Sequence, residues 1–184
     1  MRVYLAGPDV FLPDAQAVAR AKLAACADRG IEGVFPFDIE ASPSASGSFE
    51  AGSAIARANL ALMRGCDAIL ANVTPFHGPS ADIGTGFELG FFAALGRPIY
   101  AYSGDTRSFA ARVRALAGLA DDAGRHADGV AIEDFGHGDN LMLSGAAALS
   151  GGAWVARDEP GLAAMEAFSA CLDMLAARLT AAAE

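Results

Sequence analysis

An α/β fold with a parallel sheet is predicted by the way short apolar runs alternate with helical segments along these 184 residues. The runs at residues 2–6, 33–38, 67–73 and 98–102 are typical of buried strands. Helical periodicity occurs between them, which indicates right-handed crossovers from one parallel strand to the next. The length fits one domain that spans residues 1–184.

The first half of the chain contains three of these strands and two helices. A helix is expected at residues 14–29, where apolar residues recur at helical spacing and Gly30 follows. After the second strand, the serine- and glycine-rich residues 41–52 are expected to form a loop. Helical periodicity returns at residues 53–64. Four apolar side chains there fall near one face: Ile55, Ala58, Leu62 and Met63.

The centre of the chain is the stretch from residue 81 to residue 100. It begins with a loop that carries Asp82 and continues as an apolar helix that carries Glu88, with Gly96 as the expected helix end. A buried, ionised glutamate costs stability unless something pairs with it. A glutamate on a solvent face near a helix N-terminus is instead favoured by the helix dipole. Both environments remain open for Glu88 from this segment alone.

The pattern is weaker after residue 102. Residues 107–119 are compatible with a helix, residues 121–138 are polar and glycine-containing, and residues 140–143 form a short apolar interruption. A last helix is expected at residues 159–183. Its regularly spaced apolar stripe predicts core packing rather than a cofactor site.

Composition excludes several classes of function. The net charge of −9 and the pI near 4.7 disfavour binding to nucleic acids. No charge-free apolar run reaches about 18 residues, so no membrane span is expected. The N-terminal apolar stretch is too short for a signal peptide, which predicts a cytoplasmic location. Cys26, Cys66 and Cys171 lack disulfide or metal spacing and are expected to be buried thiols. Neither a metal nor a cofactor is expected.

Several familiar catalytic motifs are missing from the sequence. No GxGxxG follows the first strand, and neither a Walker-type loop, an HExxH pair nor a GxSxG elbow is present. What remains are acids and amides near the carboxyl ends of the expected strands, where ligands bind in open α/β sheets, and in the expected helices. They are Asp9, Asp38, Glu40, Asn59, Asp82 and Glu88. Two carboxylates in unlike environments are the minimum for double displacement at an acetal-like carbon.

The chain resembles the nucleoside 2-deoxyribosyltransferase family in five segments that occur in the family's order: VYLAGP at 3–8, residues 59–71, TPFHGPSAD at 74–82, GTGFELG at 84–90 and NLML at 140–143. The resemblance covers about residues 1–145. It implies a flavodoxin-like fold, with a doubly wound sheet of five parallel strands and helices on both faces. It also implies exchange of the base of a 2′-deoxynucleoside through a covalent deoxyribosyl-enzyme, so the partners would be deoxynucleosides and free nucleobases.

The resemblance assigns catalytic roles to four residues of this sequence. Glu88 matches the nucleophile that attacks C1′ of the deoxyribose, and Tyr4 matches the tyrosine that holds that carboxylate in place. Asp82 matches the aspartate that contacts the sugar 5′-hydroxyl. Asn59 stands where well-known members have an aspartate that relays a proton to the base. This is a departure, because an amide can hydrogen-bond the base but cannot donate an acid proton.

Further positions are expected to bind substrate: Gly7, Asp38, Glu40, Asp82, Gly84, Asn140 and Met142. Glu40 falls where the family has an amide or acid that reads the base. Asn140 and Met142 match residues that family members lend to the neighbouring subunit's site. The resemblance therefore implies a homo-oligomer, at least a dimer.

Three functions remain in competition. The first is transfer of 2-deoxyribose between bases; a 5′-phosphate beside Asp82 would be repelled, which favours nucleosides over nucleotides. The second is hydrolysis of the N-glycosidic bond of a nucleoside or a nucleoside 5′-monophosphate. Related nucleotide hydrolases tend to have a small hydroxyl residue where Asp82 stands, which counts against the monophosphate. The third is non-catalytic binding of a nucleoside, which a retained acid in an apolar helix disfavours.

Overall fold

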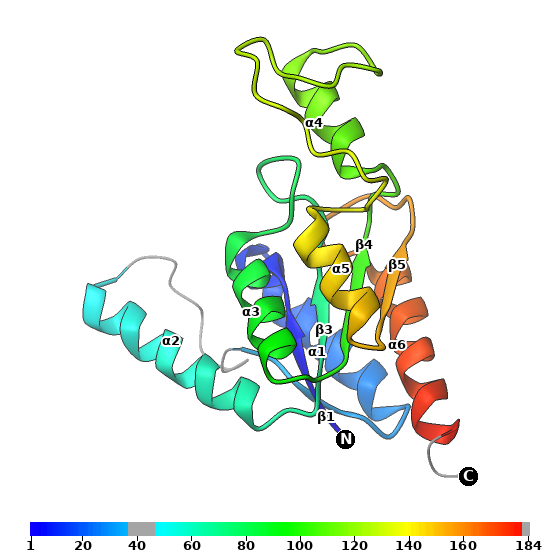
Figure 1. The fold of residues 1–184 in the computed structure, drawn as a ribbon. Coiled ribbons are helices and arrows are strands. Elements are labelled where there is room, and N and C mark those ends of the chain that lie inside the picture. Colours follow the sequence, from blue (N-terminus) through cyan, green and yellow to red (C-terminus); the bar gives the residue numbers. More distant parts are fainter. Residues whose placement is uncertain (37–46, 182–184) are drawn as a thin grey trace.

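The computed structural model describes residues 1–36 and 47–181, which form one five-stranded sheet in the order β2-β1-β3-β4-β5 (Figure 1). The strands are β1 (Arg2–Ala6), β2 (Glu32–Val34), β3 (Ala68–Asn72), β4 (Ile99–Ser103) and β5 (Ala153–Ala156). All neighbouring strands are parallel. This is the flavodoxin-like strand order, so the predicted fold class is confirmed.

Helices cover both faces of the sheet. One face packs against α1 (Ala15–Ala27) and α6 (Met165–Ala181), and the other against α3 (Ile83–Ala94) and α5 (Leu141–Leu149) (Figure 1). Side chains of a strand alternate between the two faces. On β1, Val3 and Leu5 therefore face α1 and α6, whereas Tyr4 faces α3. This alternation places the Tyr4 side chain beside the central helix.

The core bears out two expectations from the sequence. The apolar stripe of α6 is core, since Phe168, Leu172 and Leu175 are buried against the sheet. The three cysteines are free and buried. Burial raises the pKa of Cys26 to about 11 and that of Cys171 to about 12, so both thiols stay protonated at neutral pH.

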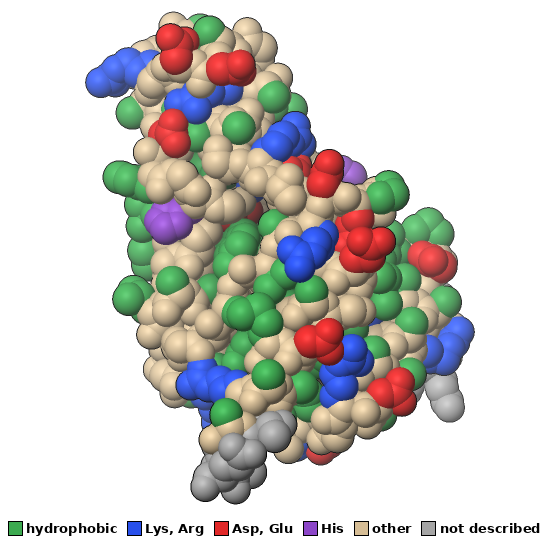
Figure 2. All heavy atoms as spheres, turned by 90° about the vertical axis from the view of Figure 1, so that its right-hand side faces the viewer, with side chains coloured by type: hydrophobic (Ala, Val, Ile, Leu, Met, Phe, Trp, Pro, Cys, Tyr) green, Lys and Arg blue, Asp and Glu red, His purple; other side chains and the backbone are tan. Residues whose placement is uncertain are grey.

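Two helices project from this body. The N-terminal half of α2 (Phe49–Arg64) extends away from the sheet, and its Phe49 and Ile55 side chains are 86% and 55% exposed (Figure 1). Only the C-terminal end of α2 enters the core, through Met63. At the other end of the molecule, α4 (Phe109–Ala117) and the following loop form a lobe that stands above the sheet (Figure 1) and projects from the top of the molecular surface (Figure 2).

Several expected boundaries were wrong in the first half of the chain. The second strand ends at Val34 rather than at residue 38. Helix α2 begins at Phe49 rather than at residue 53, because the Ser48 side chain accepts a hydrogen bond from the backbone N–H of Ala51 and caps the helix. The expected apolar face of α2 is not buried at Ile55, since nothing in the described residues covers that part of the helix.

The second half of the chain contains two elements that the sequence did not reveal. The apolar interruption at residues 140–143 is the start of α5, and β5 supplies the fifth strand from only four residues. The last helix begins at Met165 rather than at residue 159. No helix among the described residues has the length and apolar character needed to cross a membrane.

Candidate active site

Glu88 lies on α3 at the border between core and surface, and its partner is Tyr4. One turn apart, Leu89 and Phe92 are buried and hold the helix against the sheet. The hydroxyl of Tyr4, itself fully buried, donates a hydrogen bond of 2.7 Å to Oε1 of Glu88. Of the two environments left open by the sequence, the structure therefore shows the paired, half-buried one.

This environment changes the acidity of both groups. Burial raises the pKa of Glu88 to about 7; the nearby charge of Asp82 acts in the same direction, and the hydrogen bond from Tyr4 opposes the shift. Burial and the charge of Glu88 raise the pKa of Tyr4 well above its usual value, so Tyr4 remains a donor. The ionised carboxylate is poorly stabilised here, and bonding to an electrophilic carbon removes its charge.

Asp82 is the N-cap of α3. Its Oδ2 atom accepts hydrogen bonds from the backbone N–H and the hydroxyl of Thr85, at 3.0 and 3.3 Å. A Cβ on Gly84 would lie 2.9 Å from the same Oδ2 atom, so glycine leaves room for the carboxylate. Asp82 thus has a fixed position at the end of the helix that carries Glu88.

Gly7 begins the turn that follows β1 and leads into the short 3-10 helix η1 (Pro8–Phe11). Its φ of 148° is rare for residues with a side chain, and an added Cβ would lie 2.6 Å from Cβ of Asn72. The turn therefore packs directly on the end of β3. Glycine is required here for this close approach, whatever role its backbone has in binding.

Asp9 is not free for chemistry. Its side chain is buried and accepts hydrogen bonds from Nζ of the fully buried Lys22 at 2.9 Å and from Nδ2 of Asn72 at 3.1 Å. Lys22 also donates to the hydroxyl of Tyr102 at 2.8 Å. Sequence reasoning placed Asp9 among the candidate acids and missed Lys22. The signal was present, because Lys22 shares the buried face of α1 with Val18, Ala19 and Cys26.

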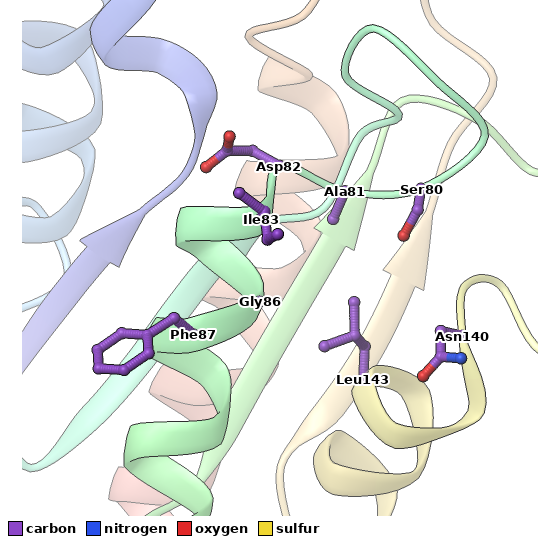
Figure 3. A pocket seen from close by; sticks show the side chains of 8 residues that line it. All are labelled: Ser80, Ala81, Asp82, Ile83, Gly86, Phe87, Asn140 and Leu143. Carbon is purple, nitrogen blue, oxygen red and sulfur yellow. The ribbon is translucent and has the colours of Figure 1, made fainter.

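A pocket of about 520 Å³ lies between the N-terminal ends of α3 and α5 (Figure 3). Eight residues line it: Ser80, Ala81, Asp82, Ile83, Gly86, Phe87, Asn140 and Leu143. Tyr4 and Glu88 are not among them. The Asp82 carboxylate points away from Asn140 and Leu143 (Figure 3), and its charge helps to raise the pKa of Glu88.

The remaining expected residues take varied positions. Asn140 is the N-cap of α5, where its Oδ1 accepts from the backbone N–H of Met142 and its Nδ2 donates to Glu133. Met142 is 69% exposed. Asn59 is half-buried on α2, one turn before the core residue Met63. Asp38 and Glu40 lie outside the described residues.

A further pair near the pocket was also missed from sequence. Asp139, next to the recognised Asn140, is fully buried beside Arg112 of α4. Within residues 1–36 and 47–181, no group of three or more His, Cys, Asp and Glu side chains is arranged to hold a metal ion.

Comparisons with known proteins identify the family of this chain. The chain matches the nucleoside 2-deoxyribosyltransferase family over residues 3–142. It is 34% identical to an uncharacterised protein of Schizosaccharomyces pombe, over 96% of this chain and 89% of that protein.

Solved structures that are similar to it include the following two. A 2-deoxyribosyltransferase from Leishmania mexicana has a TM-score of 0.65 and 31% identity, covering 94% of this chain and 97% of that one. A conserved protein from Enterococcus faecalis V583 shares the fold, with a TM-score of 0.59 and 20% identity over 97% and 98% of the two chains. From the match over residues 3–142, we conclude that the chain belongs to the nucleoside 2-deoxyribosyltransferase family.

Proposed function

We propose that this protein transfers 2-deoxyribose between nucleobases by double displacement, with Glu88 as the nucleophile. The observation that carries the proposal is the hydrogen bond of 2.7 Å from Tyr4 to Oε1 of Glu88. It orients one half-buried carboxylate in a chain that belongs to a family of deoxyribosyltransferases. With Oε1 engaged by the phenol, Oε2 is the oxygen that bonds to the sugar.

Two displacements complete the proposed reaction. In the first, Oε2 of Glu88 bonds to C1′ as the C1′–N bond breaks, and the electron pair of that bond leaves with the base nitrogen, which takes up a proton. In the second, a nitrogen of the incoming base bonds to C1′, loses its proton, and Glu88 leaves as a carboxylate. Both steps pass through an oxocarbenium-like state that the nearby negative charge stabilises. A sugar without a 2′-hydroxyl forms this cation more easily.

Asp82 is the proposed anchor of the sugar. Thr85 fixes its Oδ2 atom through the N-cap hydrogen bonds, which leaves Oδ1 to accept a hydrogen bond from the 5′-hydroxyl. A 5′-phosphate at the same place would meet a carboxylate of like charge. The proposed substrates are therefore deoxynucleosides rather than nucleotides.

For the base, we propose contacts from Asn59 and from the segment that carries Asp38 and Glu40. Asn59 hydrogen-bonds the base but does not supply its proton, because an amide has no acidic hydrogen at neutral pH. Gly7 and Gly84 contribute by leaving space, since a side chain at either position would meet Asn72 or Asp82.

We further propose that the active unit is at least a dimer in which Asn140 and Met142 complete the neighbouring site. Exposed apolar side chains support this proposal. Ile83, Phe87 and Met142 are 91%, 61% and 69% exposed, and the first two line the pocket that Asn140 also lines. A second copy of the chain placed here would cover them and limit the access of water to the intermediate.

A base-exchange assay tests the proposed function. Deoxyinosine and adenine incubated with the protein are expected to yield deoxyadenosine and hypoxanthine. Release of hypoxanthine and free deoxyribose without deoxyadenosine would instead identify a hydrolase, and binding without turnover would identify a non-catalytic protein. Glu88→Gln is expected to abolish exchange, whereas Glu166→Gln, which changes an exposed acid of α6, should retain it.

A further inference from the structure

Two chain segments meet beside the pocket, and a buried carboxylate joins them. Residues 79–82 lead into α3, and residues 138–140 lead into α5. Asp139 lies between the two segments with its side chain fully buried. It accepts hydrogen bonds from the hydroxyl of Ser80 at 2.5 Å, the backbone N–H of Ala81 at 2.9 Å and the backbone N–H of Asn140 at 2.7 Å.

Arg112 joins the same two segments from the other side. Its Nε donates to the backbone oxygen of Pro79 at 2.7 Å, and its Nη2 donates to that of Gly138 at 2.5 Å. Nη2 also lies 3.5 Å from Oδ2 of Asp139. The Arg112 side chain is only 3% exposed. Its Nη1 donates to the backbone oxygen of Arg107, just before α4.

The energetics of such a pair favour a role in positioning the neighbouring segments rather than in stabilising the fold. The attraction within a buried ion pair barely offsets the cost of removing both charges from water. Apolar residues of similar size therefore often stabilise a fold equally well. A planar guanidinium that bonds two backbone oxygens and faces a carboxylate instead fixes relative positions. The positions fixed here belong to the residues directly before Asp82 and Asn140.

We propose that Asp139 and Arg112 are positioning residues that set the width of the pocket between α3 and α5 and the placement of Asp82. This inference rests on the proposed function, in which Asp82 binds the sugar. Because the pair does not touch Glu88 or Tyr4 in the described contacts, its loss weakens deoxynucleoside binding more than it slows transfer from bound substrate. Through Arg112, the α4 lobe is tied to the same pocket.

Kinetics of Asp139→Asn test the inference. The variant keeps an oxygen for Ser80 and Asn140 but presents an amide nitrogen to Ala81 and Arg112. Ala81 then loses its acceptor and Arg112 its counter-charge, which loosens the connection between the two segments. The KM for deoxyinosine is expected to rise about tenfold or more, with kcat changed less than about threefold. A loss of kcat at unchanged KM, or wild-type values for both, would overturn the proposal.

Arg112→Met is a second test variant, and Arg114→Met is its matched control. Both arginines lie on α4 and pair with an aspartate, but Arg114 bonds Asp134 and the backbone oxygen of Ala123, away from the pocket. Arg112→Met is expected to reproduce the KM effect, and Arg114→Met to leave it unchanged. Arg112→Lys should not rescue the KM, because a lysine cannot bridge two backbone oxygens and a carboxylate in one plane.

Hydrogen exchange separates this inference from the proposed function. In Asp139→Asn, backbone amides of residues 80–82 and 138–140 are expected to exchange faster together, with the rest of the sheet unchanged. This readout needs no substrate, so it remains decisive even if the wild-type protein exchanges no bases. Unaltered exchange in both segments would refute the inference, whereas absent base exchange by the wild type would refute only the proposed function.

Discussion

The hydrogen bond from Tyr4 to Glu88 makes a specific prediction for the pH dependence of the reaction. Tyr4→Phe removes one oxygen and leaves the ring, which packs 6.1 Å from the ring of Phe92, so the core keeps its shape. The lost bond stabilises the ionised form of Glu88. Its removal is therefore expected to raise the pKa of Glu88 further above about 7.

The size of the shift follows from the strength of the bond. A hydrogen bond to a charged group contributes about 1.5–3 kcal/mol, and one pKa unit corresponds to about 1.4 kcal/mol. The pKa of Glu88 should thus rise by about one to two units. Since only the ionised carboxylate attacks C1′, the rising limb of kcat/KM against pH should move upward by the same amount.

The assay is kcat/KM for base exchange between deoxyinosine and adenine from about pH 5 to about pH 10. The matched control is Tyr100→Phe, which removes the hydroxyl of a buried tyrosine that packs on the opposite face of the sheet. Its rising limb should coincide with that of the wild type. If the rising limb of Tyr4→Phe also coincides with that of the wild type, ionisation of Glu88 does not control the reaction.

Three further predictions concern stability, measured by urea unfolding. The folded pKa of Glu88 lies near 7 and its ordinary value is 4.5, so the folded state binds this proton more tightly and stability falls as pH rises between these values. Glu88→Gln should therefore raise the free energy of unfolding by up to about 3 kcal/mol at about pH 8 and change it little at about pH 4. An equal effect at both pH values would contradict this. Lys22→Met leaves Asp9 buried without its cation and should lower the free energy of unfolding by about 3–5 kcal/mol. Adding Asp9→Leu should recover part of that loss; fully additive effects in the double variant would argue against the pairing. Gly7→Ala should cost about 1–3 kcal/mol, because its Cβ would meet Asn72, and a neutral effect would show that the turn can move.

Much of the site was predictable because it follows from short segments with strong patterns. The apolar strand before Gly7 and the apolar helix between Asp82 and Gly96 are each continuous in sequence, and a parallel sheet places their ends at one edge. The pattern did not predict which side chain meets Glu88, although the alternation of strand side chains explains why Tyr4 faces α3. The structure shows the two side chains in contact, as the family resemblance implied.

The parts that escaped prediction depend on contacts distant in sequence. Helix α5 has only nine residues, three of them alanine, and β5 has only four, so neither has enough periodicity to stand out. Asp9 looked like a free acid at a strand end, because nothing local reveals that Lys22 reaches it from α1. Asp139 lies in the loop before α5, and its partner Arg112 is 27 residues away on α4.

Helix α2 illustrates a different limit. Its amphipathic pattern predicts a buried face, but the structure leaves Ile55 more than half exposed. Periodicity tells which side chains share a face and does not tell what covers that face.

The central claim is that Glu88 forms a covalent bond to C1′ of the deoxyribose. A 2′-fluorinated deoxynucleoside, whose oxocarbenium-like state is disfavoured, should react slowly enough for the glycosyl-enzyme to be isolated, digested and sequenced by mass spectrometry. The account predicts one added fluorodeoxyribosyl group, located on Glu88 and absent from Glu88→Gln. A label on any other residue, or release of the base with no label while the wild type still exchanges bases, would contradict it.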